Sequence, residues 1–182
     1  NEILKNIVFE NFKKYKKYIN PNTYDKYILE INKELKIIKD CDMAMYFILN
    51  NRGVERAIRK YNATLTKSGR GSAVSFLINK FLGLTEVDRL KAPVTLYPTR
   101  FMSAERILET RSLPDIDLNF ADVKPVVKAF KDILGDDGIY YMVAYKPLQE
   151  SSAFRLMCKA KGLHISEYNE IAKNIEYYKN DD

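Results

Sequence analysis

An alternation of acidic and apolar residues constrains the fold of this chain more than any other feature. The run LPDIDLNF at residues 113–120 suits a β-strand, because successive side chains of a strand point to opposite faces. Ile116, Leu118 and Phe120 then share one face, and Asp115, Asp117 and Asn119 share the other. Such a strand needs a core beneath it and leaves its polar face available for chemistry. The chain is therefore expected to contain a sheet and not helices alone.

The two carboxylates of this run are the first candidate site. Asp115 and Asp117 are two residues apart, which separates their Cα atoms by roughly 7 Å in a strand. Two divalent ions about 3.5–4 Å apart serve phosphoryl transfer by activating the attacking oxygen and steadying the leaving group. Carboxylate oxygens without nearby His or Cys favour Mg²⁺ or Mn²⁺ over zinc. We predict a metal site here; for this pair taken alone, a solvated acidic face is the plainer alternative.

The second candidate site is the glycine-rich run SGRGS at 68–72, between an expected strand and an expected helix over 73–82. Glycine allows a tight turn that exposes backbone N–H groups, and a helix start adds the positive end of its dipole. Arg70, Gly71 and Ser72 are therefore candidate ligands of a triphosphate. The run matches neither a P-loop nor a dinucleotide fingerprint. For this motif alone, a plain turn with Ser72 as helix cap is the alternative.

The remaining elements are predicted from hydrophobic spacing. Further helices are expected over 1–20, 24–39, 52–60, 122–134, 149–161 and 167–179. Further strands are expected over 63–66 and 139–145, and the apolar run 43–50 fits either a buried strand or a buried helical turn. Because helices and strands alternate, the expected fold class is α/β (α+β), a mixed β-sheet covered by helices. We divide the chain into a domain over 1–146, with N-terminal helices in 1–60, and further helices over 147–182.

Composition and charge bound the class of protein. The 182 residues are 46% hydrophobic and carry 30 Lys and Arg against 24 Asp and Glu, a formal net charge of +6. This composition excludes a disordered or collagen-like chain. The positive charge fits a polyanionic partner, and the basic residues Arg52, Arg56, Arg59 and Lys60 are candidate DNA contacts. The alternative for such a cluster is a solvated helix face.

The cysteines and the apolar runs bear on location. Cys41 and Cys158 are too few for a disulfide scaffold or a four-cysteine zinc site, so we expect a reducing compartment, the cytoplasm. The apolar stretch 43–49 is far shorter than the ~20 residues of a membrane helix, and 1–20 does not read as a signal peptide. No membrane partner is expected. The start at Asn1 without Met leads us to expect a piece of a longer protein.

Two stretches in order resemble bacterial DNA polymerase III alpha subunits, the C-family replicative polymerases. They are SGRGSAVSFLINKFLGLTEVD at 68–88 and TRFMSAERILETRSLPDIDLNF at 99–120, the latter with the family's Arg-Phe, Glu-Arg and Pro-Asp-hydrophobic-Asp elements. The resemblance covers roughly residues 24–175. It implies a DNA polymerase beta-like nucleotidyltransferase palm over 1–146 and the beginning of the thumb in 147–182.

The same resemblance implies roles for individual residues. Asp115 and Asp117 match the palm aspartates that bind two catalytic Mg²⁺ or Mn²⁺ ions. Gly71 and Ser72, with Arg70 beside them, match the pair that faces the triphosphate of the incoming nucleotide. Arg100 matches an arginine near the active site. Family members add a deoxynucleoside monophosphate from a dNTP to a primer 3′-OH on template DNA and release pyrophosphate.

The departures from the family pattern limit what this chain is expected to do alone. The family's third palm aspartate, its fingers and its N-terminal phosphoesterase-like domain find no counterpart here, and we do not assign Asp122, Asp136 or Asp137 to the missing role. The chain alone is therefore expected to be inactive or nearly so. The remaining polymerase domains and a sliding clamp are its candidate protein partners.

Two other functions stay open at this point. A stand-alone nucleotidyltransferase acting on a non-DNA acceptor would need a third carboxylate within 122–182, on a strand beside Asp115 and Asp117. A non-catalytic nucleic-acid-binding module would keep the fold without the metal chemistry.

Overall fold

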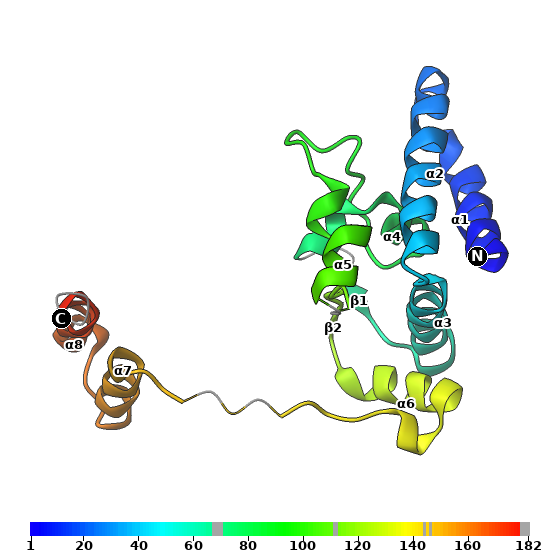
Figure 1. Ribbon diagram of the computed structural model, residues 1–182. Helices are drawn as coiled ribbons and strands as arrows, with labels where there is room; N and C mark the ends of the chain where they lie inside the picture. Colours follow the sequence, from blue (N-terminus) through cyan, green and yellow to red (C-terminus); the bar gives the residue numbers. More distant parts are fainter. Residues whose placement is uncertain (67–70, 111–112, 144, 146, 179–182) are drawn as a thin grey trace. The chain divides into compact units, whose positions relative to one another are not determined.

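The computed structural model describes residues 1–66, 71–110, 113–143, 145 and 147–178. They belong to two compact units, Asn1–Tyr140 and Tyr141–Asp182, which are described separately (Figure 1). Arg70 of the predicted triphosphate site lies outside the described residues.

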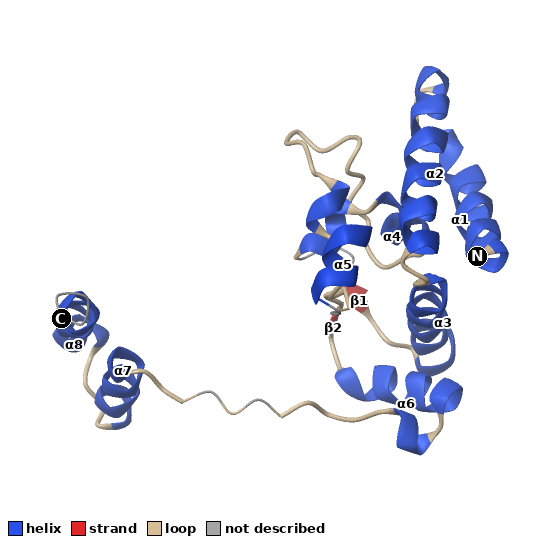
Figure 2. Ribbon diagram, viewed as in Figure 1, coloured by secondary structure: helices blue, strands red, loops and turns tan. Residues whose placement is uncertain are grey.

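The first unit is mostly helical (Figure 2). Its α-helices are α1 (Glu2–Tyr15), α2 (Tyr24–Asp40), α3 (Ala44–Tyr61), α4 (Leu77–Phe81), α5 (Ala104–Thr110) and α6 (Val123–Leu134). Short 3₁₀ turns lie between them: η1 (Lys16–Tyr18), η2 (Pro21–Thr23), η3 (Ser72–Ser75), η4 (Pro98–Arg100) and η5 (Asp136–Gly138). The strands are β1 (Leu65–Thr66) and β2 (Asn119–Phe120).

The ambiguous apolar run at 43–50 is helical and continues into the basic segment as the single helix α3. Its buried residues include Phe47, Ile48, Val54 and Ala57, which recur at helical spacing. The run is apolar because this part of the helix faces the core, and the exposed basic residues lie on the outer side of the following turns.

The main core lies among α1, α2, α3 and α4 and is rich in aromatic side chains. The ring of Phe47 stacks on Phe76 with centroids 6.1 Å apart, and Phe76 contacts Phe101 at 5.1 Å. These three rings tie α3, the segment before α4 and the residue after η4 into one cluster. Burial of such large apolar surfaces supplies most of the favourable free energy of folding.

Two charged residues, Glu34 and Arg89, also lie in this core. Glu34 of α2 is fully buried and Arg89 is 8% exposed. Burial raises the pKa of Glu34, and the Arg89 charge and two backbone amide donors oppose that rise by stabilising the carboxylate.

The structure corrects the expectation of a mixed β-sheet. Among the described residues the sheet contains β1 and β2 alone, paired antiparallel with Leu65 opposite Phe120 and Thr66 opposite Asn119. The predicted strand over 113–120 therefore contributes only its last two residues to the described ladder. A two-stranded sheet of this length is marginal by itself, so the packing of its apolar residues on the helical core stabilises it.

The predicted strand over 139–145 is also wrong for its described residues. Tyr140, Tyr141, Met142, Val143 and Tyr145 belong to no strand, and 69–94% of each is exposed. β-Forming residues favour a pleated, partly buried surface, and their preference does not create a strand without a neighbouring strand to pair with. No such neighbour lies beside them within the described part of the chain.

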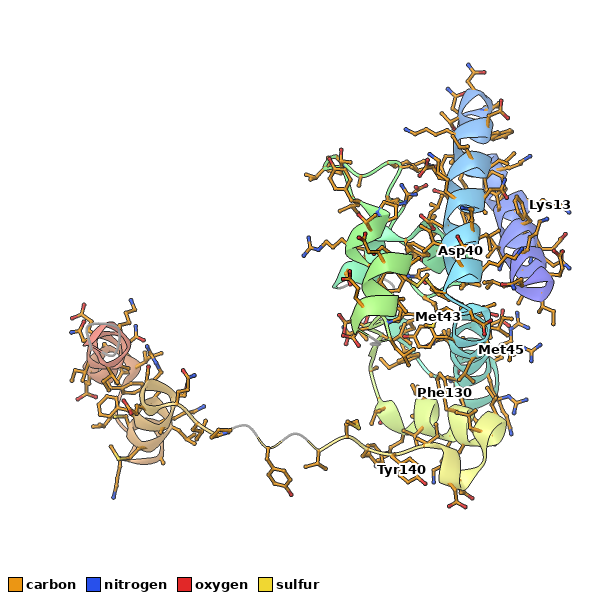
Figure 3. All side chains as sticks on the ribbon, viewed as in Figure 1. Lys13, Asp40, Met43, Met45, Phe130 and Tyr140 are labelled. Carbon is orange, nitrogen blue, oxygen red and sulfur yellow. The ribbon has the colours of Figure 1, made fainter. Side chains whose placement is uncertain are left out.

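Helix α6 packs directly on α3 at a glycine. A Cβ atom on Gly53 would lie 2.2 Å from Cζ of Phe130, so the aromatic ring occupies the space of the missing side chain (Figure 3). Asp122, at the start of the predicted helix over 122–134, caps α6: its Oδ1 accepts a hydrogen bond from the Lys124 N–H at 3.0 Å.

The second unit contains α7 (Glu150–Ala160) and α8 (Ile165–Tyr178), which pack on each other. Cys158, Tyr168 and Ala172 are buried between them, and the Ser151 hydroxyl donates to the Ala172 carbonyl at 2.8 Å. In the described parts of both units, no helix has the length and apolar character that a bilayer crossing requires.

Candidate functional site

The acidic run keeps the predicted alternation although little of it is in a strand. Ile116, Leu118 and Phe120 are half-buried and pack against the main core. Asp115, Asp117 and Asn119 alternate with them and are exposed. We call these three polar residues the acidic edge. The apolar contacts hold the backbone on the core, so both carboxylates face solvent.

Gly71 brings the glycine-rich turn to the acidic edge. Its φ of +67° is a conformation that side-chain-bearing residues rarely adopt. A Cβ atom there would lie 2.2 Å from Oδ2 of Asp117 and 3.3 Å from its Cγ. The Asp117 carboxylate therefore lies against the bare backbone of Gly71. Positions 71 and 117, which are far apart in sequence, therefore lie side by side.

Ser72 follows as the first residue of η3, and the predicted helix over 73–82 is interrupted after this turn. Phe76 is extended (φ −108°, ψ 114°) and separates η3 from α4. The Ser75 hydroxyl donates to the Ser72 carbonyl at 2.6 Å, which closes the turn. The break allows the Phe76 ring to enter the aromatic core while Gly71 stays exposed. We call Gly71 and Ser72 together the glycine turn.

Helix α3 holds the residue before the acidic edge through Tyr46. The Tyr46 hydroxyl donates to the Pro114 carbonyl at 2.5 Å. Burial raises the pKa of Tyr46, and the nearby Asp115 carboxylate raises it further. The negative charge of Asp115 thus disfavours ionisation of the Tyr46 hydroxyl. From the sequence, Tyr46 is expected to be an ordinary core residue, and nothing in the local pattern signals its contact with position 114.

Arg100 is exposed at the end of η4. The next residue, Phe101, is buried against Phe76, and η4 lies beside η3. Arg100 is therefore attached to the same aromatic cluster as the glycine turn. Its predicted role toward a nucleotide stays a prediction.

The basic cluster of α3 lies in a separate groove of about 570 Å³, with Asp132 and Ile133 of α6 among its lining residues. Lys60 and Arg56 pair with the Asp132 carboxylate at 2.6 and 3.5 Å. The hydrogen bond from Lys60 lowers the pKa of Asp132, and the same contact raises the pKa of Lys60. Arg59 pairs with Glu55 at 3.5 Å. Part of the positive charge is thus neutralised.

Two cavities of the first unit, the α3 groove and one further cavity, do not coincide with the acidic edge. A second one, of about 390 Å³, lies among α1, α3 and α4 and is lined by Tyr15, Asn51 and Lys80 among others. Neither of these two is lined by the acidic edge, the glycine turn or Arg100. The case for the site therefore depends on the contact between Asp117 and Gly71.

Comparison with known proteins adds a decisive observation. The family model described as "Bacterial DNA polymerase III alpha NTPase domain" matches residues 2–181. The chain belongs to this family. It is 27% identical to the DNA polymerase III subunit alpha of Ureaplasma parvum over 97% of the chain and 18% of the relative. It is 28% identical to that of Bacillus subtilis over 83% of the chain and 13% of the relative.

A third relative carries a different name within the same group. The error-prone DNA polymerase of Bdellovibrio bacteriovorus is 35% identical over 53% of the chain and 8% of its own length. The chain spans less than a fifth of the length of each of these DNA polymerase relatives.

For a DNA polymerase III alpha-like chain, the number of acidic ligands matters. The described residues contain no cluster of three or more His, Cys, Asp or Glu side chains that could hold a metal ion. Three acidic residues that follow the acidic edge have other contacts: Asp122 caps α6, Asp132 pairs with Lys60, and Asp136 pairs with Lys131 at 3.0 Å. Among the described residues, the acidic edge therefore offers a metal ion two carboxylates, those of Asp115 and Asp117.

Proposed function

We propose that this chain is the palm portion of a DNA polymerase III alpha subunit and contributes to template-directed addition of a dNMP to a primer 3′-OH. The polymerase relatives and the family match support this assignment. The observation that carries it is the contact between the Asp117 carboxylate and the Gly71 backbone. An acid that binds cations and a turn that binds phosphates must adjoin in any enzyme that handles a metal-bound triphosphate.

The residues of the acidic edge fit a hard divalent cation. Asp115 and Asp117 offer exposed carboxylate oxygens, which Mg²⁺ and Mn²⁺ prefer. The Asp117 carboxylate occupies the space that a Cβ on Gly71 would fill, so its oxygens lie directly against the backbone of the glycine turn. When bound, two ions would supply activation of the primer oxygen and charge neutralisation on the triphosphate. A further ligand would come from outside the described residues.

In this proposal the protein's own groups divide the work. Asp115 and Asp117 hold the cations, Gly71 lets the phosphates approach the backbone, and Ser72 offers its hydroxyl and N–H at the start of η3. Arg70 and Arg100 add positive charge toward the same phosphates. Tyr46 fixes the backbone before Asp115 through Pro114.

Metal binding tests the proposal directly. Titration with Mn²⁺, followed by its electron paramagnetic resonance signal, is expected to show binding to the wild-type chain. The double substitution Asp115→Asn and Asp117→Asn removes both anionic ligands and should weaken binding at least about tenfold. Asp137→Asn, which changes an exposed acid of η5, is the matched control and should bind like wild type. Equal binding by all three proteins would overturn the metal assignment.

We further propose that the groove of α3 contacts phosphates of the primer–template DNA. Asp132 and Glu55 pair with three of its four basic residues, whereas Arg52 is exposed and has no ion pair within the described residues. The charge of Arg52 is therefore the one in this groove that no ion pair within the described residues balances, so Arg52 is the strongest candidate for a phosphate contact.

Salt dependence measures this contact. If Arg52 neutralises one phosphate, Arg52→Gln should reduce the slope of log K against log salt by about 0.9. Lys36→Gln changes an exposed lysine of α2 that pairs with Asp40 and should leave the slope unchanged. An unchanged slope in Arg52→Gln would contradict the proposed contact between this groove and DNA phosphates. DNA binding by a chain without Mn²⁺ affinity would instead favour a non-catalytic module.

The wider assignments are part of the same proposal. We assign 1–146 to the palm and 147–182 to the start of the thumb, with the other polymerase domains and a sliding clamp as partners and the cytoplasm as location. The rival stand-alone nucleotidyltransferase is less well supported, because Asp122, Asp132 and Asp136 have structural contacts away from the acidic edge.

A further inference from the structure

A buried ion pair lies behind the glycine turn and takes no part in the proposed function as described so far. Glu34 of α2 is fully buried, and its carboxylate accepts four hydrogen bonds. The Leu77 and Ile78 N–H groups donate at 2.9 and 2.8 Å. Arg89 donates to Oε1 through Nε at 2.9 Å and through Nη2 at 2.7 Å. Both carboxylate oxygens are thus occupied by protein donors.

A buried ion pair of this kind is poor evidence for stability as such. Removing two charges from water costs several kcal/mol per ion, and apolar replacements of the same volume are often as stable. A pair whose donors include two successive backbone amides also fixes the path of the chain at those amides. The useful question is which segment Glu34 fixes.

That segment is the one that presents the glycine turn. Leu77 and Ile78 open α4, and α4 follows η3, whose first residue is Ser72. One buried side chain connects α4 to η3: Asn79 donates to the Ala73 carbonyl at 2.9 Å. Within η3, the buried Ser75 donates to the Ser72 carbonyl at 2.6 Å. Glu34 therefore fixes the first residues of α4, Asn79 ties α4 to η3, and the Ser75 bond closes η3 at Ser72, the second residue of the glycine turn.

Arg89 is held on the far side of α4. Its neighbour Asp88 accepts hydrogen bonds on Oδ2 from the hydroxyls of Tyr15 and Tyr27 at 2.8 and 2.7 Å. Arg89 also donates to Glu30 at 2.8 Å. The start of α4 is thus anchored on α2 through Glu34, and the chain after α4 is anchored on α1 and α2 at residues 88 and 89.

We propose that Glu34, held by Arg89, is a positioning residue for nucleotide binding. It fixes the start of α4 and thereby sets the orientation of the Gly71 and Ser72 N–H groups toward a triphosphate. Glu34 does not touch the ligand in this scheme. The inference rests on the proposed triphosphate role of the glycine turn, and its first test is made without nucleotide.

The ligand-free test compares Glu34→Gln with Glu30→Gln by ¹H–¹⁵N NMR of the whole chain. Glutamine keeps the volume of Glu34 but replaces one accepting oxygen with an NH₂ group, which cannot accept from the Leu77 or Ile78 amide. Amide shifts and hydrogen exchange should change at 77 and 78 and also at 72 and 73. Glu30 contacts the same Arg89 but neither amide, so Glu30→Gln should leave 72 and 73 unchanged. Unchanged signals at 72 and 73 in Glu34→Gln would overturn the positioning role.

The second test uses Mg²⁺–dATP as ligand and records the shifts of the Gly71 and Ser72 amides. Glu34→Gln is expected to weaken nucleotide binding about tenfold, the equivalent of one well-placed hydrogen bond to a charged group. Glu30→Gln should bind like wild type. Equal nucleotide affinity in Glu34→Gln and wild type would overturn the positioning role. No binding by wild type would instead refute the proposed triphosphate role, while the ligand-free result still decides whether Glu34 fixes the turn.

A conservative pair of variants covers the case in which Glu34→Gln does not fold. Arg89→Lys keeps the positive charge but loses the fork that donates twice to Oε1. It should show a smaller change at 72 and 73 in the same direction. Lys33→Arg, which alters an exposed partner of Glu30, should show none. A change of equal size in both variants would contradict the proposal.

Discussion

Two sets of carboxylates in the first unit differ in what their oxygens contact. Glu34 is fully buried, and its oxygens accept from Arg89 and two backbone amides. Asp115 and Asp117 are exposed at the acidic edge, and Asp117 lies against a glycine backbone. Both oxygens of the Glu34 carboxylate are occupied by protein donors, whereas the Asp115 and Asp117 carboxylates are open to solvent. The buried acid thus organises the chain, and the two exposed acids are the ones available for the proposed cation.

Because of this difference, the buried carboxylate needs a charged partner inside the protein, whereas the two exposed carboxylates do not. A buried charge must be matched inside the protein, since removing one partner leaves the other without solvent. An exposed carboxylate is hydrated, so its loss costs the fold little. Stability and ligand binding should therefore respond to different residues.

The largest expected effect is on stability, from Arg89→Met. This change preserves volume but leaves Glu34 buried without its charged partner, which should cost about 3–5 kcal/mol of unfolding free energy. Urea unfolding measures the loss. Lys33→Met, at an exposed partner of Glu30, should cost less than about 1 kcal/mol. Similar losses in the two variants would remove the distinction between buried and exposed charge.

An intermediate effect is expected from Gly71→Ala. Its φ of +67° and ψ of −158° are a combination that essentially glycine alone adopts, so alanine should cost about 1–3 kcal/mol of unfolding free energy, and the new Cβ would displace the Asp117 carboxylate. Gly83 is a matched control, because its φ is +72° and no atom lies within 4 Å of an added Cβ. Both variants should lose stability in urea, because each places a Cβ at a positive φ, but only Gly71→Ala should weaken Mn²⁺ binding. Equal Mn²⁺ binding by the two would argue against a site at Asp117.

The smallest effect on stability is expected where the effect on binding is greatest. Asp115→Asn with Asp117→Asn should change the unfolding free energy by no more than about 0.5 kcal/mol, because both side chains are exposed. Measuring this double variant beside Arg89→Met places both sets of carboxylates on one scale. A loss as large as that of Arg89→Met would show that the acidic edge supports the fold.

Local pattern predicts those features whose cause is local. Alternation at 113–120 identifies which side chains face the core, and helical spacing with Asp122 as cap identifies α6. The break at Phe76 escapes prediction, because it is caused by the ring entering a cluster with Phe47 and Phe101. The mixed sheet is wrong for the same reason: β-forming residues at 139–145 need a neighbouring strand that local sequence cannot supply.

Long-range polar contacts escape prediction almost entirely. Glu34 and Arg89 are 55 residues apart, and a charged residue on a helix is ordinarily expected to be solvated. The link between Gly71 and Asp117 is expected only because each motif suggests phosphate or metal chemistry. Tyr46 carries no such signal, since a tyrosine among apolar residues looks the same whether or not its hydroxyl holds Pro114.

The exposed run Tyr140, Tyr141, Met142 and Val143 has a practical consequence for work on the purified chain. These side chains carry no charge, and each is at least 69% exposed. Uncharged, β-prone segments in this state act as templates for intermolecular pairing. The purified chain should therefore aggregate as its concentration rises, and Met142→Lys should reduce this aggregation.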